Sequence, residues 1–210
     1  MLALRLLAAV TLASLSLAAA DAPRVVYTKS FPRSLPPYME IQVERDGSAL
    51  YKETPDDDQP LKFRLKDPET SEIFALAARL DKFTRKLESG LPVAKMGDKT
   101  FRWEEGATRN QQTFNYSEDP DAHTLQDWFE RIAESEQFLI DLERTARFDK
   151  LGVNQVLLQM EVAWEKKRLV AVDQFLPMLE RVANNESYLN MARERAAYLA
   201  DAFRGKPKSE

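Results

Sequence analysis

The sequence has no cysteine among its 210 residues and only one histidine, His123. The lack of cysteine excludes both a disulfide framework and a cysteine-linked lipid anchor, so the fold must rest on an apolar core. A single imidazole excludes metal sites built from several histidines and leaves one candidate general base. No spacing of Ser, Asp or Glu around His123 is diagnostic of a catalytic triad.

Several motifs of well-known catalytic chemistry are also missing. The sequence has no glycine-rich nucleotide-binding loop and no Ser-x-x-Lys, Gly-x-Ser-x-Gly or His-Glu-x-x-His motif. We therefore predict no cofactor. Acidic residues outnumber basic ones by 34 to 30 and the pI is near 5.3, which argues against a nucleic-acid partner.

Long apolar runs are missing after residue 20. Residues 1–20 carry one early cation, Arg5, before an apolar run that ends in Ala18-Ala19-Ala20, a pattern typical of a cleavable signal peptide. No later stretch approaches the roughly 20 apolar residues of a membrane-spanning helix. We therefore predict cleavage after Ala20, a mature net charge of −5 after loss of Arg5, and a periplasmic or extracellular location.

Alternating apolar and polar residues predict several half-buried strands before residue 118. In Tyr38 to Arg45, for example, Met39, Ile41 and Val43 alternate with acidic and amide side chains. Asp46-Gly47 follows directly and predicts a two-residue hairpin turn of the primed type, which needs positive φ.

Helical periodicity replaces this alternation from Asp119 onward. Asp119 and Pro120 provide a helix cap and a favourable first residue for one long helix over 119–147. Three shorter amphipathic segments follow and indicate a small bundle. The expected class is α+β: a small antiparallel sheet covered by helices at 68–84 and 119–147, continuing into a C-terminal helical bundle. The expected parts are a signal peptide (1–20), a strand-rich part (21–118), the long helix with the bundle (119–204) and a disordered tail (205–210).

The strand-rich half resembles uncharacterised secreted bacterial proteins of the domain-of-unknown-function type. The resemblance lies in PPYMEIQVERDGSALYKE, LKFRLKDPETSEIFALAARLDKF, KTFRWEEG and FNYSEDPDAHTLQDWFERI, about half of the mature chain. It implies an exported bacterial protein and carries over no functional residue.

Aromatic residues on the expected strands are the candidate binding residues. We expect Tyr38, Tyr51 and Trp103 to form an exposed aromatic face on the sheet. The acidic run Asp56-Asp57-Asp58 is a weaker candidate for calcium ligands, because it lacks the spacing of an EF-hand loop. The acidic side of the long helix, from Glu118 to Glu143, is a second expected surface, suited to basic partners.

These observations favour an exported, non-catalytic binding or scaffolding protein of the cell envelope, with another protein as its partner. One alternative is a hydrolase whose carboxylates converge only in the fold. A carbohydrate-binding module that uses the sheet aromatics is another.

Overall fold

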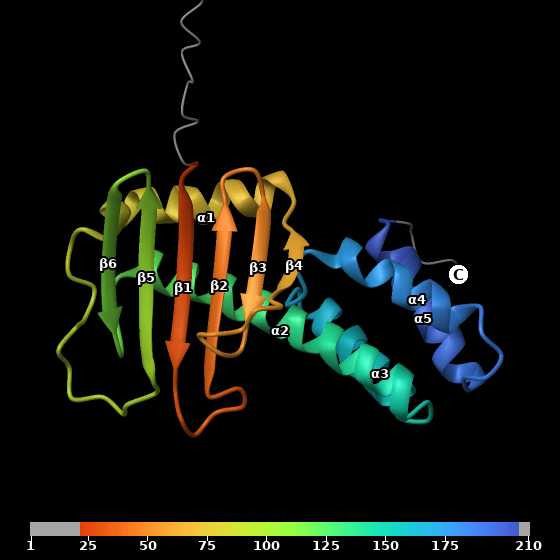
Figure 1. The fold of residues 1–210 in the computed structure, drawn as a ribbon. Coiled ribbons are helices and arrows are strands. Elements are labelled where there is room, and N and C mark those ends of the chain that lie inside the picture. The colour runs from red at the N-terminus through yellow and green to blue at the C-terminus, as the bar shows by residue number, and fades with distance from the viewer. Residues whose placement is uncertain (1–21, 206–210) are drawn as a thin grey trace, which may run out of the picture.

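The computed structural model describes residues 22–205, and the predicted signal peptide and residues 206–210 lie outside this range (Figure 1). Six strands form one antiparallel sheet in the order β4-β3-β2-β1-β5-β6. The strands are β1 (Arg24–Ser30), β2 (Tyr38–Glu44), β3 (Ser48–Lys52), β4 (Leu61–Arg64), β5 (Asp98–Glu105) and β6 (Thr108–Phe114). The helices are α1 (Asp67–Arg79), α2 (Pro120–Phe148), α3 (Val153–Glu165), α4 (Leu176–Ala183) and α5 (Asn190–Phe203), with short 3-10 turns η1 (Asp81–Phe83) and η2 (Val172–Phe175).

The two faces of the sheet differ because strand side chains alternate in direction. Odd-numbered residues of β1 and β2, such as Tyr27 and Ile41, point toward α1 and α2, which lie together on one side of the sheet (Figure 1). The rings of Tyr27 and Phe129 of α2 stack there, with centroids 5.0 Å apart. The even-numbered residues of these strands lie on the opposite face, which we call the open face.

The turn between β2 and β3 corrects the predicted hairpin. Three residues, 45–47, separate the strands, and the Gly47 amide donates to the Glu44 carbonyl at 3.0 Å. Of the three, Gly47 alone has positive φ, at 86°, whereas a primed two-residue turn would need it at both central positions. A three-residue loop of this kind shifts the strand pairing by one residue relative to a two-residue turn, so Ile41 pairs with Tyr51.

The long helix α2 begins as predicted. The Asp119 side chain accepts from the amides of Asp121 at 2.9 Å and Ala122 at 3.3 Å, and Pro120 is the first helical residue. The helix runs behind the sheet and continues beyond its edge into the other helices (Figure 1). Its first half buries Leu125 and Phe129 against the sheet.

A second apolar core lies between the last part of α2 and the C-terminal helices. Its largest members include Leu142, Leu157, Phe175, Leu199 and Phe203. The α+β class with a C-terminal helical part is therefore confirmed. Within residues 22–205, no helix is both long and apolar enough to cross a membrane.

Candidate functional site

The three predicted aromatic residues do not share one face. Tyr38 lies on the open face, partly exposed. Tyr51 pairs with Ile41 and is only 1% exposed, and Trp103 pairs with Val25 and is 5% exposed. Both belong to the core beneath α1 and α2. The expected exposed aromatic face is therefore wrong for Tyr51 and Trp103, and Tyr38 alone remains accessible.

The remaining sequence candidates are placed apart from one another. Asp56 and Asp58 are exposed in the loop before β4, and Asp57 accepts from the Gln59 amide at 2.9 Å. In the part of the chain that the structure describes, no group of three or more acidic, His or Cys side chains is arranged to hold a metal ion. His123 is exposed, with its Nε2 2.5 Å from the Ser117 carbonyl oxygen.

The acidic side of α2 is largely neutralised by cations from other elements. Arg168 contacts both Asp127 and Glu134, the latter at 2.9 Å. Three more carboxylates of this region are paired in the same way: Asp119 with Arg85, Asp121 with Arg79, and Glu130 with Lys29. These pairs reduce the net negative charge that α2 presents to solvent.

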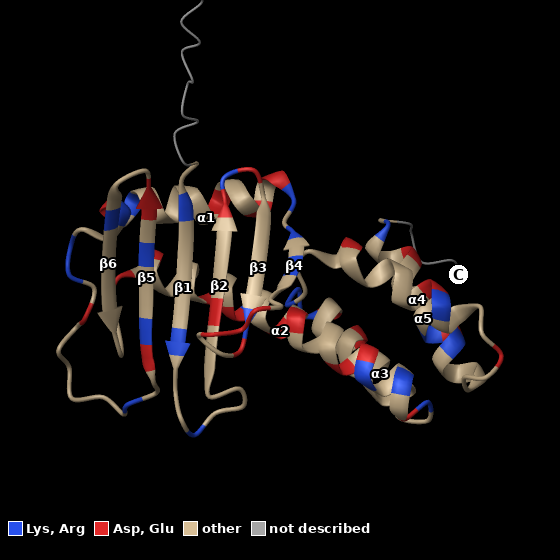
Figure 2. Cartoon of the chain, viewed as in Figure 1, with Lys and Arg blue, Asp and Glu red and all other residues tan. Residues whose placement is uncertain are grey.

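The open face, in contrast, has a surplus of positive charge. By register it carries six cations and four carboxylates, a net charge of +2, whereas the whole chain has −4 (Figure 2). The cations are Arg24, Lys52, Lys62, Arg64, Arg102 and Arg109, and the carboxylates are Glu40, Glu44, Asp98 and Glu104. Among residues 22–205, the helices that cover the sheet pack on its other face.

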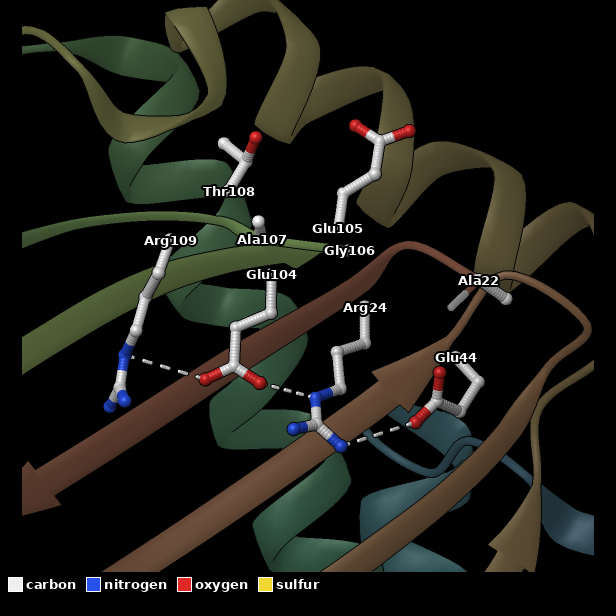
Figure 3. A pocket seen from close by; sticks show the side chains of 9 residues that line it. All are labelled: Ala22, Arg24, Glu44, Glu104, Glu105, Gly106, Ala107, Thr108 and Arg109. Atoms are coloured by element: carbon white, nitrogen blue, oxygen red, sulfur yellow. Dashed lines mark hydrogen bonds and ion pairs between the residues drawn. The ribbon is translucent and has the colours of Figure 1, made fainter. Parts of the chain in front are cut away.

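Glu104 is the centre of one ion-pair network on this face (Figure 3). Arg24 Nε donates to its carboxylate, Arg102 Nε lies 2.7 Å away and Arg109 Nε 3.6 Å away. Arg24 also reaches Glu44, at 3.8 Å. Burial alone would raise the pKa of Glu104, but the hydrogen bond from Arg24 and the charge of Arg102 outweigh burial and lower that pKa.

Glu40 is the centre of a second network. It accepts from Tyr38 Oη at 2.9 Å and from Gln42 Nε2 at 2.7 Å, and Lys52 Nζ lies 3.3 Å away. These contacts outweigh the desolvation of Glu40 and lower its pKa. Desolvation, followed by the hydrogen bond to Glu40, raises the pKa of Tyr38. Tyr38 is therefore held in one orientation as a neutral phenol.

Long polar side chains lie across the centre of the open face. Val26 belongs to this face, yet it is 0% exposed, and its direct neighbours on the adjacent strands are Gln42 and Arg102. Their aliphatic stems cover the valine while their polar ends form the networks. The centre of the open face is thus covered by polar side chains that belong to the networks of Glu40 and Glu104.

Two hollows lie along this layer, and Glu44 lines both of them. One, of about 510 Å³, is lined by Arg24, Glu44, Glu104 and the β5–β6 turn (Figure 3). The other, of about 480 Å³, lies over β2, β3 and β4 and is lined mainly by apolar surface, with Leu50 and Phe63 among its residues. Together with Tyr38 they give the open face polar and apolar contact points.

The carboxylates of the chain do not form a recognisable acid–base pair. Glu40 and Glu104 are on the open face, but their lowered pKa values keep them ionised and unsuited to donate a proton. Burial raises the pKa of Glu136 to about 7, a value suited to a general acid. Glu136, however, is 0% exposed and out of reach of a substrate.

No family model matches the chain, and a search of curated proteins finds no significantly similar sequence. Sequence reasoning missed Arg24, Arg102 and Arg109 as members of one surface. Arg24 and Arg102 each adjoin an apolar residue on their own strand, which indicates the face they occupy, whereas Arg109 lies among polar residues on β6. The order of strands in the sheet was needed to bring all three together.

Proposed function

We propose that this chain is a non-catalytic binding protein of the cell envelope that takes an acidic protein segment on its open face. The observation that carries the proposal is the surplus of six cations over four carboxylates on that face in an otherwise acidic chain. Such a surface attracts acidic partners at a distance and orients them on contact.

The exposed cations at the two ends of the face support this proposal. The Arg109 side chain is 62% exposed, and its nearest carboxylate, Glu104, is already shared with Arg24 and Arg102. Lys62 is exposed and has no ion-pair partner among residues 22–205. Both cations therefore remain available to a partner's carboxylates, while Tyr38 and Leu50 offer apolar contact between them.

The chemistry of the carboxylates supports a non-catalytic role over the hydrolase alternative. Glu40 and Glu104 on the open face have lowered pKa values that keep them ionised, and the carboxyl with a pKa near 7, Glu136, is buried. Burial of Tyr51 and Trp103 likewise argues against carbohydrate binding, because neither ring offers a flat face to a sugar. The exported location remains an expectation from residues 1–20.

Affinity capture from an envelope extract tests the proposal. The wild-type protein should retain an acidic protein at low salt and release it at high salt. The K62E/R109E variant reverses two exposed cations of the open face and should retain it at least about tenfold less. The matched control, K86E/K166E, makes the same charge change at exposed lysines outside the sheet and should behave as wild type. Equal capture by both variants would contradict the proposal.

A further inference from the structure

The far end of the helical bundle exposes two large apolar side chains. Phe148, the last residue of α2, is 75% exposed, and Leu151, in the turn to α3, is 72% exposed. This turn lies at the end of the bundle that is remote from the sheet (Figure 1). We call Arg147, Phe148, Lys150, Leu151 and Arg181 the bundle tip.

A shallow hollow of about 490 Å³ adjoins Phe148, between the end of α2 and α4. Most of its lining is apolar, with Ile140 and Met178 among its residues, and Glu143, Arg144, Arg147 and Arg181 also line it. The tip therefore combines protruding apolar groups with an apolar depression and two of these cations, Arg147 and Arg181.

These two arginines are free of carboxylate partners. In the described part of the chain, no ion pair joins Arg147 or Arg181 to an acidic side chain, and Arg147 lies 5.0 Å from the Phe148 ring centre. Lys150 Nζ donates to the Ser187 hydroxyl at 2.9 Å and lies 5.6 Å from the centre of the Tyr188 ring, and it forms no ion pair within residues 22–205.

The acidic groups around the tip are partly engaged by the protein itself. Asp141 pairs with Arg144 at 2.6 Å, and the Asp149 carboxylate accepts from the Gly152 amide at 3.1 Å. Asp149 and Glu143 are both exposed and form no ion pair within the described residues, so they remain as two opposing charges. Arg147, Lys150 and Arg181 outnumber these two carboxylates by one, which gives the tip its local positive character.

We propose that the bundle tip docks on an anionic lipid surface. Phe148 and Leu151 enter the boundary between headgroups and acyl chains, and Arg147 and Arg181 meet lipid phosphates, for which guanidinium geometry is well suited. A lipid surface fits better than a protein partner because the apolar side chains protrude from a turn. A bilayer takes up protruding side chains without a matching pocket.

A single fluorescent label tests this contact, because the chain has no cysteine of its own. We would place an environment-sensitive fluorophore at L151C and, as a matched control, at L158C on the same helix α3, where the leucine is 38% exposed. Vesicles of phosphatidylcholine mixed with phosphatidylglycerol should shift the emission of the label at 151 to the blue and leave that at 158 unchanged. Vesicles of phosphatidylcholine alone should shift neither.

Variants of the tip complete the test. F148S/L151S and R147E/R181E should each bind the anionic vesicles at least about tenfold less than wild type, with an unchanged melting temperature. The charge control K86E/K166E should bind as wild type. The proposal is overturned by absence of vesicle binding in the wild type, by equal emission shifts at 151 and 158, or by unchanged vesicle binding in either tip variant.

Discussion

The side-chain amide of Gln174 donates a hydrogen bond to Glu136 at 2.8 Å, which joins η2 to the middle of α2. This contact lies where α2 passes from the core beneath the sheet to the core of the bundle. Glu136 is 0% exposed, and its second carboxyl oxygen has no hydrogen-bond partner among residues 22–205. A carboxylate ion at this position would be strongly desolvated.

The free energy of unfolding should therefore fall as the pH rises from the pKa of Glu136 in the unfolded chain to its higher pKa in the folded chain. Burial raises its pKa from 4.5 to about 7 in the folded chain. Between these values the folded protein retains a proton that the unfolded chain has released, so unfolding becomes more favourable with rising pH. The protonated carboxyl group therefore gives its full contribution to stability below pH 4.5, and this contribution is lost above about pH 7. The change in unfolding free energy over this range is about 3 kcal/mol. Denaturant unfolding across this pH range measures it.

E136Q is the control for this pH dependence. The amide keeps an acceptor for Gln174 and carries no charge at any pH, so the variant should be more stable than wild type at pH 7.5. The difference between the two pH profiles should vanish near pH 4.5. Parallel profiles for wild type and E136Q would show that Glu136 does not set the dependence.

Substitutions of Trp103 and Tyr38 should differ in their cost in unfolding free energy, because Trp103 lies in the core and Tyr38 on the open face. Replacing Trp103 with alanine removes a 5% exposed indole from the sheet core and should cost about 3–5 kcal/mol of unfolding free energy. Tyr38→Phe removes only the hydrogen bond to Glu40 and should cost about 1 kcal/mol. Denaturant titration measures both. A similar cost for the two changes would contradict the assignment of these residues to opposite faces.

Gly47→Ala should destabilise the β2–β3 turn more than a matched change elsewhere. Gly47 has a φ of 86°, and an added Cβ would lie 2.8 Å from the Leu65 carbonyl oxygen. Gly106, in the β5–β6 turn, has a φ of 56° with open space around it. Alanine at 106 should cost about 1 kcal/mol from backbone strain alone, and alanine at 47 about 2–3 kcal/mol. Thermal unfolding of both variants provides the comparison, and equal costs would exclude a steric contribution at Gly47.

Local patterns were sufficient to predict the type and order of most elements of this fold, although the helix expected at 68–84 ends at Arg79, before three residues with positive φ. Alternation located the strands, and the 3.6-residue period, the Asp119 cap and Pro120 located α2. These signals are carried by neighbouring residues, so they need no knowledge of the rest of the chain. The change from alternation to helical periodicity near residue 118 gave the α+β class for the same reason.

The prediction that Tyr51 lies on the exposed face was wrong because the face of Tyr51 depends on the number of residues in the turn between β2 and β3. A two-residue turn at Asp46-Gly47 would have paired Tyr51 with Gln42 on the open face. The observed three-residue loop pairs Tyr51 with Ile41 in the core. A shift of one residue reverses the face of every side chain on the strand, so an error in turn type became an error about the site.

The open face itself depends on contacts between residues far apart in the chain. Glu104 meets Arg24, eighty positions earlier, because β5 pairs with β1 and not with β4. Charge counts along the sequence also missed that Arg168 neutralises Asp127 and Glu134 on α2. In both cases strand order and helix packing decide which charges remain available, and neither is encoded in a local pattern.

The most direct test of the account is a calorimetric titration with an extended, glutamate-rich peptide, with its lysine-rich counterpart as the control ligand. Wild-type protein and K86E/K166E should bind the acidic peptide with equal affinity, and K62E/R109E should bind it at least about tenfold more weakly. The lysine-rich peptide should bind none of the three proteins. Preference of the wild type for the lysine-rich peptide, or equal affinity of K62E/R109E and wild type for the acidic one, would contradict a partner site on the open face.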